Sequence, residues 1–310
     1  MSKKKKKSAK QNQEKTVDLH RQLRFLKENR QRIRDNHEIY YSKNQDELDI
    51  GQYYKVISPL EFDGLRLFYK YSELITNTHR NLIPYFISKD LYLYTWVDLH
   101  PDGSVKSIYS GERKNPESVI LEDYKVISQK YEEFQEFLRK IRDMEFGSFR
   151  ELKLSERLLK MNTEHIVPQS WFGAVEPMKG DLHHLFVCEP ECNIARSNFP
   201  FEDFSFYNPE SPNEPIHNFC GIAASEKFEP EYGKGTAARA MLYFLLRYPI
   251  AIKKAFRVEI NIPLLVRWHR EFPAGLYEKH RNQAIYRIQG NRNPFIDMPD
   301  LVDNILFPNN

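Results

Sequence analysis

One stretch of the chain, between Met161 and Phe204, concentrates side chains that could act together on a phosphodiester bond. It reads MNTEHIVPQSWFGAVEPMKGDLHHLFVCEPECNIARSNFPFEDF and is rich in imidazoles, carboxylates and amides. Hydrolysis of such a bond near neutral pH needs a base to deprotonate water, a cation to offset developing negative charge, and donors to hold the phosphate. The stretch therefore indicates metal-assisted hydrolysis.

Four residues of this stretch fit those roles. We expect His165 to be the base, because an imidazole with its ordinary pKa of about 6.5 is mostly neutral at neutral pH. Glu164 and Asn193 offer oxygen atoms, the ligand type that Mg²⁺ prefers, and water would fill the remaining positions. Arg196 lies about one helical turn beyond Asn193, so its planar guanidinium could hold a non-bridging phosphate oxygen.

The spacing of these residues predicts two strands and a helix. Neighbouring residues of a strand point to opposite faces, so Glu164 and His165 can share a site only where the first strand ends. Pro168 supports an end at that point. The segment DLHHLFV is the predicted second strand, and a helix is predicted to begin near Asn193.

The predicted second strand carries three further candidates. Alternation places Asp181 and His183 on one face and His184 on the other. One of the two imidazoles is expected to support the site through a hydrogen bond to a residue that does the chemistry. The alternative is that both are ordinary core or surface histidines.

The cysteines allow a separate metal hypothesis. Three cysteines in a chain of apparently intracellular type favour thiols or a metal over a disulfide framework. Thiolates and imidazole select zinc, so a structural zinc site is one interpretation, and buried thiols are the alternative. The ligands of that site would be Cys188, Cys192, His217 and Cys220.

The surrounding pattern predicts the elements that position these residues. Leucines and Ile33 at helical spacing predict a first helix, and Ser58-Pro59-Leu60-Glu61 is a capping pattern for a second. The aromatic segment LYLYTWVDL, the turn HPDGS and the segment VKSIYSG predict a β-hairpin. The predicted helices cover about 16–36, a segment that follows Ser58, about 116–143, and several segments of 236–289 that begin with Thr236 as a cap.

The formal net charge of +3 hides a strong segregation of charge. Residues 1–15 carry seven Lys and one Glu, whereas 164–231 hold 3 cations and 12 anions, and 234–292 hold 12 cations and 3 anions. An acidic segment beside a basic helical one suits a metal site next to a phosphate-binding surface; the alternative is two solvated faces that neutralise one another. The candidate phosphate contacts are Lys179, Arg239 and Arg247.

Composition excludes several classes of protein. Apolar residues make up 41% of the chain, too many for a disordered protein. The longest apolar run is Ala240–Leu246, far short of the roughly 20 residues of a membrane span. Because no apolar region follows the cationic start, a signal peptide is not expected, and the prediction is a cytoplasmic protein.

Six collinear segments resemble the endonuclease I family of ββα-metal (His-Me finger) nucleases. They are YTWVDLHPDGSVKSIYSG, EHIVPQSWF, KGDLHHLF, CNIARSNFPF, FEPEYGKGTAARAMLYFLLRYP and EKHRNQAIYRIQGNRNPFIDMP, and they span roughly 91–303. The resemblance implies an α+β fold with a ββα-metal core wrapped by helices. Together with the Lys-rich composition of the start and the helical spacing that follows it, the resemblance predicts three parts. They are a disordered Lys-rich tail (1–15), a mainly helical N-terminal region (16–90) and a nuclease domain (91–310).

The resemblance also implies an activity. It is a largely sequence-nonspecific endonuclease that acts on DNA, with RNA as a second candidate substrate, and leaves 5′-phosphate ends. His165 matches the general base, and Glu164 and Asn193 match the ligands of one Mg²⁺, with Mn²⁺ or Ca²⁺ as alternatives. Relatives place an arginine between the two strands, whereas Trp171–Gly180 contains only Lys179 as a cation. An unconfined nuclease would endanger its own cell, so a protein inhibitor or regulator is a further candidate partner.

Two other functions remain open from the sequence. A catalytically inactive nucleic-acid-binding protein of the same fold would show salt-sensitive binding without cleavage. The intact set of Glu164, His165 and Asn193 argues against it, because a retired site has no need for these polar groups. A zinc-dependent hydrolase centred on the cysteines would require tightly held zinc for turnover.

Overall fold

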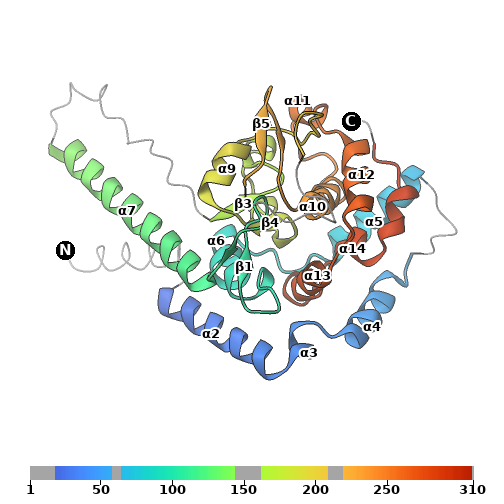
Figure 1. Ribbon diagram of the computed structural model, residues 1–310, viewed down its shortest axis with the longest axis horizontal. Coiled ribbons are helices and arrows are strands. Elements are labelled where there is room, and N and C mark those ends of the chain that lie inside the picture. Colours follow the sequence, from blue (N-terminus) through green and yellow to red (C-terminus); the bar gives the residue numbers. More distant parts are fainter. Residues whose placement is uncertain (1–17, 58–63, 144–161, 209–218, 309–310) are drawn as a thin grey trace.

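The computed structural model describes residues 18–57, 64–143, 162–208 and 219–308 (Figure 1). Most of these residues lie in helices. In chain order the helical elements are α2 (Leu19–Asp35), α3 (His37–Tyr40), α4 (Lys43–Tyr54), α5 (Gly64–Thr78), α6 (Tyr85–Ile87), the π-helix η1 (Ser88–Val97), α7 (Pro116–Asp143), α8 (Gln169–Phe172), the 3-10 turns η2 (Met178–Gly180) and η3 (Leu182–His184), α9 (Pro190–Arg196), α10 (Lys234–Arg247), α11 (Lys254–Arg257), α12 (Ile262–Glu271), α13 (Leu276–Gln289), α14 (Pro294–Asp297) and the 3-10 turn η4 (Pro299–Asp303).

The described strands are short and form three two-stranded sheets, and an isolated bridge also joins Phe201 to Phe228. They are β1 (Val105–Lys106), β2 (Arg113–Lys114), β3 (Thr163–His165), β4 (Leu185–Val187), β5 (Ile222–Ala224) and β6 (Lys227–Glu229). Antiparallel pairing joins β1 to β2, β3 to β4 and β5 to β6. This mixture of many helices and small antiparallel sheets is consistent with the expected α+β class.

Two apolar clusters hold the described residues together. The larger surrounds α10, whose run Ala240–Leu246 is buried on every side and packs against α5 and α12. The smaller surrounds η1 and joins Leu26 and Ile33 of α2 to Leu182 and Ile285. The N-terminal helix therefore shares a core with segments far along the chain, and the expected domain boundaries at 15 and 90 stay a prediction.

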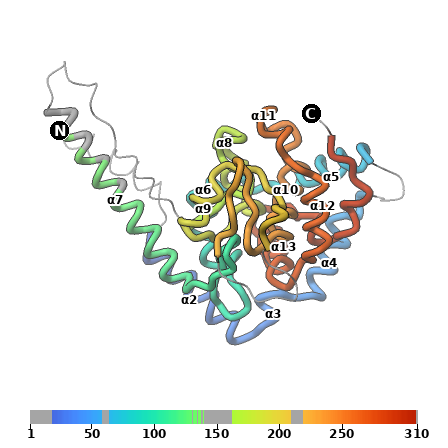
Figure 2. Tube along the Cα trace, turned by 45° about the horizontal axis from the view of Figure 1, so that its top comes forward, coloured from blue at the N-terminus to red at the C-terminus, as the bar shows by residue number. Residues whose placement is uncertain are grey.

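Two of the predicted helices are confirmed. α2 covers the described part of the first predicted helix, and α7 spans Pro116–Asp143 as expected. Figures 1 and 2 both show α7 projecting from the body of the molecule. The capping pattern at Ser58 lies outside the described residues, and among the described residues of that predicted helix Gly64–Thr78 forms α5.

The predicted hairpin is wrong in its first strand. Ser88–Val97 forms the π-helix η1, although its aromatic residues favour a strand. Leu93, Tyr94 and Val97 are fully buried against several elements, so tertiary packing decides the conformation here. The turn is present, with Gly103 at a φ of 75°, and it leads into β1, which pairs with β2.

Two further boundaries differ from the sequence expectation. Only Leu185–Val187 of DLHHLFV is a strand, because Asp181 caps the 3-10 turn η3 by accepting a hydrogen bond from the backbone N–H of His183 at 3.1 Å. The helix expected to begin after Thr236 begins at Lys234, with Gly233 in its cap position at a φ of 75°. That helix ends at Arg247, as the interruption by Pro249 predicts.

Among the described helices, none is both long and apolar enough to span a lipid bilayer.

Candidate active site

The antiparallel pair β3–β4 and the helix α9 bring three of the predicted residues together. Glu164 and His165 are the last two residues of β3, opposite Phe186 and Leu185 of β4. Asn193 of α9 donates from its side-chain amide to the backbone oxygen of Thr163 at 2.8 Å. This bond ties α9 to the strand that carries Glu164 and His165, and it directs the amide oxygen of Asn193 away from the strand carbonyl.

Glu164 is held by two buried side chains. Its Oε1 accepts a hydrogen bond from the Tyr109 hydroxyl at 2.9 Å and lies 3.4 Å from Arg196 Nε. Arg196 is fully buried and donates from Nη2 to the backbone oxygen of Ile166 at 2.9 Å. The expectation that Arg196 grips a substrate phosphate is therefore wrong for this structure, since its guanidinium faces Glu164 and the backbone.

His165 is placed as a neutral imidazole. Its Nε2 lies 2.9 Å from the backbone oxygen of Lys179, which can only accept, so Nε2 carries the proton. Nδ1 is then the basic atom, and the amide nitrogen of Gln169 lies 3.3 Å from it. Burial lowers the pKa of His165 well below its usual value, and the imidazole of His184 and the ammonium of Lys179 lower it further. An unprotonated imidazole with a basic ring nitrogen is what a general base requires, and here that nitrogen accepts a hydrogen bond from the Gln169 amide.

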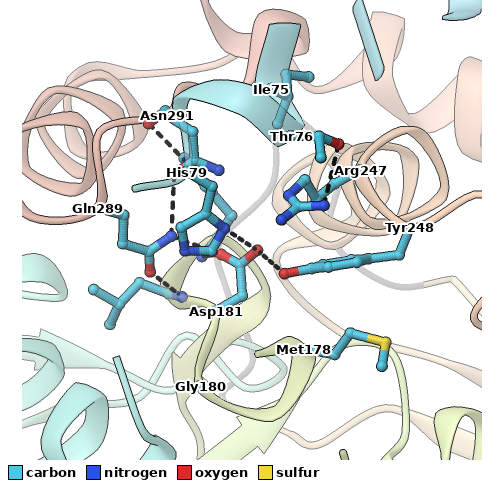
Figure 3. Close-up of polar contacts among 12 residues, drawn as sticks. Ile75, Thr76, His79, Met178, Gly180, Asp181, Arg247, Tyr248, Gln289 and Asn291 are labelled. Atoms are coloured by element: carbon cyan, nitrogen blue, oxygen red, sulfur yellow. Dashed lines mark hydrogen bonds and ion pairs between the residues drawn. The ribbon is translucent and has the colours of Figure 1, made fainter. Parts of the chain in front are cut away.

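Asp181 is the centre of a buried polar cluster (Figure 3). Its Oδ2 accepts hydrogen bonds from the hydroxyls of Tyr243 at 2.8 Å and Tyr248 at 3.0 Å, and its Oδ1 accepts one from Gln289 Nε2 at 3.0 Å. His79 Nδ1 lies 3.9 Å from Oδ2. Burial alone would raise the pKa of Asp181, but the nearby imidazoles and the Gln289 amide hold it well below its usual value, so the carboxylate is charged.

The Asp181 cluster anchors the segment that orients the candidate base. Asp181 lies two residues after Lys179, whose carbonyl accepts from His165. The preceding carbonyl, that of Met178, accepts from His184 Nε2 at 2.6 Å. The rings of His165 and His184 lie 5.4 Å apart in an edge-to-face arrangement. A carboxylate bonded to α10 and α13 therefore fixes two carbonyls that set the orientation of two imidazoles.

His183 belongs to the same cluster, but it lies in the 3-10 turn η3 and not in a strand, so strand alternation does not place it there. Its ring lies 4.3 Å from that of Tyr243, and its Nε2 lies 3.3 Å from the backbone oxygen of Asn291. Burial lowers the pKa of His183 to about 4, and the carboxylate of Asp181 opposes this shift.

Of the three candidate phosphate contacts, only Lys179 stays near the candidate base. Its ammonium lies 5.1 Å from the ring centre of Tyr85, a ring that also contacts His165. Arg239 is buried and donates from Nε and Nη2 to both oxygens of Glu278, at 2.8 and 2.6 Å, so its expected role in phosphate binding is wrong.

Arg247 is also committed to the protein. It donates from Nη1 to the Thr76 hydroxyl at 3.1 Å, and its guanidinium covers the ring of Tyr248 at 4.4 Å. Figure 3 shows it beside the Asp181 cluster. The expectation that Arg247 forms a phosphate cradle is not supported by this arrangement.

The predicted zinc site is wrong. Cys192 and Cys220 form a disulfide, and two sulfurs bonded to each other cannot act as thiolate ligands. Cys188 is a buried thiol, and His217 lies outside the described residues. The disulfide joins α9, the helix of Asn193, to the residues just before β5.

The donor set at the end of β3 suits a hard divalent cation. One carboxylate oxygen from Glu164 and one amide oxygen from Asn193 are the ligand types that Mg²⁺ takes, with water in the remaining positions. Within the described ranges, no group of three or more His, Cys, Asp or Glu side chains is arranged to hold a metal ion.

The comparison with known proteins covers the part of the chain that contains the candidate site residues. The model of the endonuclease I family matches residues 70–300, which is 231 of 310 residues. The chain belongs to the endonuclease I family. All candidate catalytic and ligand residues lie inside the matched range, whereas α2 and α4 lie outside it.

Several curated relatives are also similar. An extracellular deoxyribonuclease of Aeromonas hydrophila is 31% identical over 168 residues, which are 47% of this chain and 68% of the relative. A periplasmic deoxyribonuclease of the same organism is 29% identical over 178 residues, 50% of this chain and 70% of the relative. An extracellular ribonuclease of Bacillus amyloliquefaciens is 32% identical over 161 residues, 46% of this chain and 53% of the relative.

The sequence interpretation missed several residues that hold the site. Tyr109 lies in YSG, inside one of the segments that resemble endonuclease I, so its position was available as a signal. Tyr248 also lies in such a segment, the one that ends in RYP. His79 had no such signal, because it lies outside all six segments and its contact with Asp181 crosses 102 residues of sequence. Gln289 accepts a hydrogen bond from the backbone N–H of Leu182 and donates one to Asp181, so its amide is used within the protein.

Proposed function

We propose that this chain is a divalent-metal-dependent endonuclease that hydrolyses phosphodiester bonds of DNA, with RNA as a second substrate, and leaves 5′-phosphate ends. The observation that carries the proposal is the meeting of Glu164, neutral His165 and Asn193 at the end of β3. The pair β3–β4 with α9 would then form the ββα-metal core expected for the family.

Each residue has a distinct part in the proposed reaction. Glu164 and Asn193 would hold Mg²⁺, and a bound Mg²⁺ supplies positive charge against the charge that develops on the phosphate. Nδ1 of His165 removes a proton from the water that attacks phosphorus, while Nε2 keeps its own proton and donates a hydrogen bond to the Lys179 carbonyl. The P–O3′ bond breaks, and the 3′-oxygen takes up a proton from solvent water and leaves as a hydroxyl. Tyr109 and Arg196 keep Oε1 of Glu164 in place, which fixes the direction of the carboxylate.

Support for the substrate class comes from the relatives. Those described above are named deoxyribonucleases and a ribonuclease, so both polymers are candidates and DNA is the first to test.

We also propose that the protein works in an oxidising compartment. A disulfide such as Cys192–Cys220 persists where thiols are not kept reduced. The relatives are named as extracellular or periplasmic proteins, in agreement with this. Both points favour an oxidising location over the cytoplasmic one expected from the sequence.

The proposed function is tested by incubating the full chain with supercoiled plasmid and with single-stranded RNA. We expect nicking and then linearisation in Mg²⁺, no cleavage in EDTA, and ends that a ligase joins without prior phosphorylation. Salt-sensitive DNA binding with no cleavage in Mg²⁺, Mn²⁺ or Ca²⁺ would instead show an inactive binding protein.

A further inference from the structure

A groove lies between α2, η1 and the end of α13, away from the residues assigned to chemistry. Its volume is about 430 Å³, and we call it the α2 groove. The residues of this groove used below are Arg21, Phe25, Arg32, Tyr92, Trp96 and Arg287. One wall, α2, lies outside the residues that match the endonuclease I family.

The α2 groove is positively charged. Arg21, Arg32 and Arg287 line it and are exposed, and no ion pair holds any of these three in the described part of the chain. The single carboxylate in its wall, that of Glu28, lies 3.9 Å from the guanidinium of Arg24. Three arginines outnumber the one carboxylate, which leaves the groove with a net positive charge that suits an anion with several charges.

The groove also carries three half-buried aromatic rings. Phe25 lies under the guanidinium of Arg21 at 5.6 Å, and Trp96 lies under that of Arg32 at 5.7 Å. Tyr92 is the third ring. Tyr92 and Trp96 pack against the smaller apolar cluster, whereas Phe25 is not part of it, so the Phe25 ring is the one least needed for the core.

A chain of hydrogen bonds holds part of the groove in shape. Asn29 donates from its amide to the backbone oxygen of Thr95 at 2.9 Å, which ties α2 to η1. The amide oxygen of Asn29 accepts from Arg32 Nη1 at 3.2 Å, which keeps that guanidinium beside Trp96. One arginine and one ring are thus prearranged before any ligand binds.

The rest of α2 extends the positive surface. Its 17 residues include Arg21, Arg24, Lys27, Arg30, Arg32 and Arg34 against Glu28 and Asp35. Four of these cations line a second hollow of about 350 Å³ on the helix. The charge of α2 is therefore +4 (six cations less two anions). Residues 16–163 as a whole hold 24 cations and 24 anions, so α2 is a local concentration of positive charge.

We propose that the α2 groove binds a single-stranded segment of nucleic acid, with arginines on the phosphates and bases stacked on the aromatic rings. Basic grooves with interleaved aromatic side chains bind single strands in this way, because every base offers a flat face while a duplex hides those faces. The groove would hold the polymer while the site at β3 cuts it elsewhere, and this role rests on the proposed nuclease function. An anionic lipid surface would use the charges and leave the rings without a partner.

The test is binding of a 20-nucleotide oligothymidine to the full chain in EDTA, where cleavage cannot interfere. Trp96 is half-buried and Trp171 and Trp268 are fully buried, so quenching of tryptophan fluorescence reports on the groove. We expect the quenching to disappear in Trp96→Phe, which keeps an aromatic ring in place.

Variants separate charge from stacking. The triple change Arg21→Gln, Arg32→Gln and Arg287→Gln should weaken binding about tenfold or more and reduce the slope of log affinity against log salt by about 2. Phe25→Leu should weaken binding about fivefold without changing that slope. The matched control, Lys55→Gln, Arg66→Gln and Lys70→Gln on the side of α4 and α5, removes the same charge and should change affinity less than about twofold.

Three results would overturn the inference. They are equal losses in the two triple variants, an unchanged affinity in Phe25→Leu, and binding to anionic phospholipid vesicles in place of the oligonucleotide. Because binding is measured without turnover, an inactive enzyme with this binding pattern would remove the proposed function and leave the groove assignment intact. An active nuclease without this binding pattern would remove the groove assignment and leave the proposed function intact.

Discussion

At the scale of single residues, the candidate base is oriented by a backbone carbonyl and, behind it, by a buried carboxylate. His165 is held by the Lys179 carbonyl, and that carbonyl belongs to the segment that Asp181 fixes through the hydroxyls of Tyr243 and Tyr248. Residues that hydrogen-bond to the supports of a functional residue set the orientation of that residue without touching substrate. They are also the contacts that a local sequence pattern is least able to reveal.

Removing one hydroxyl of the Asp181 cluster tests this chain of contacts. We expect Tyr248→Phe to lower kcat about threefold with little change in KM. A hydrogen-bond partner that touches the functional residue directly is worth about tenfold or more in activity, and Tyr248 acts on His165 only through Asp181 and the segment that follows Met178, so its effect should be smaller. The matched control is Tyr54→Phe, which removes a buried hydroxyl that donates to Asp297 at 2.9 Å in another part of the protein. Equal kcat in the two variants would show that the Asp181 cluster only supports the fold.

The assignment of Asn193 as a metal ligand makes a separate prediction. Asn193→Ala removes one oxygen donor, so the Mg²⁺ concentration for half-maximal cleavage should rise about tenfold while activity is recovered at high Mg²⁺. The exposed residue Asn77, changed to Ala, serves as a control. An unchanged Mg²⁺ requirement would remove Asn193 from the ligand pair.

The site residues show what a sequence can and cannot reveal. The placement of Glu164, His165 and Asn193 around β3 was predictable, because their types fit the chemistry and their segments are collinear with a family. Their roles in that chemistry stay a prediction. Arg196 and Arg239 were misassigned because an arginine reads the same in sequence whether it faces a phosphate or a buried carboxylate. Only the contacts with Glu164 and Glu278 decide between these roles.

At the scale of elements, the disulfide restrains the helix that carries Asn193. Cys192 immediately precedes Asn193 on α9, and its bond to Cys220 joins this short helix to the residues before β5. A seven-residue helix has little stability of its own, so such a link restrains it.

Thiol titration in denaturant checks this element directly. The structure predicts one titratable thiol, that of Cys188, in protein isolated without reductant, and three after reduction. Reduced protein should also lose thermal stability, by an amount typical of a 28-residue separation, on the order of 3 kcal/mol. Three thiols in unreduced protein would contradict the pairing.

Helices were predictable from the sequence where their own periodicity or capping residues determine where they form and end. α7 was found from its periodic and charged pattern, and the end of α10 from Pro249. η1 was taken for a strand because LYLYTWVDL has the composition of one, while burial of Leu93 and Tyr94 among distant segments overrides that preference.

At the scale of the whole molecule, buried histidines make stability depend on pH. Burial lowers the pKa of His100 to about 3, with further lowering by Lys106 and Arg113, and its ring stacks on Tyr277 at 4.2 Å. The unfolded value is about 6.5, so the unfolded chain takes up the proton first as pH falls. The contribution of His100 to the free energy of unfolding should therefore be constant above pH 6.5 and decline below it.

His100→Phe isolates that contribution, because phenylalanine can keep the stacked ring and does not titrate. We expect the loss of unfolding free energy between pH 6.5 and pH 4 to shrink by on the order of 2 kcal/mol relative to wild type. The exposed His20, changed to Phe, should leave the profile unchanged. A decline of the same size in His100→Phe would show that His100 is not a source of the pH dependence.

The central claim is that His165 activates water for phosphodiester hydrolysis, and plasmid nicking by His165→Ala tests it most directly. With His37→Ala as the exposed-histidine control, the rate in saturating Mg²⁺ should fall at least about a hundredfold in His165→Ala alone. Wild type in EDTA should be inactive in the same assay. If His165→Ala nicks plasmid as fast as wild type in Mg²⁺, the assignment of the base at the end of β3 is wrong.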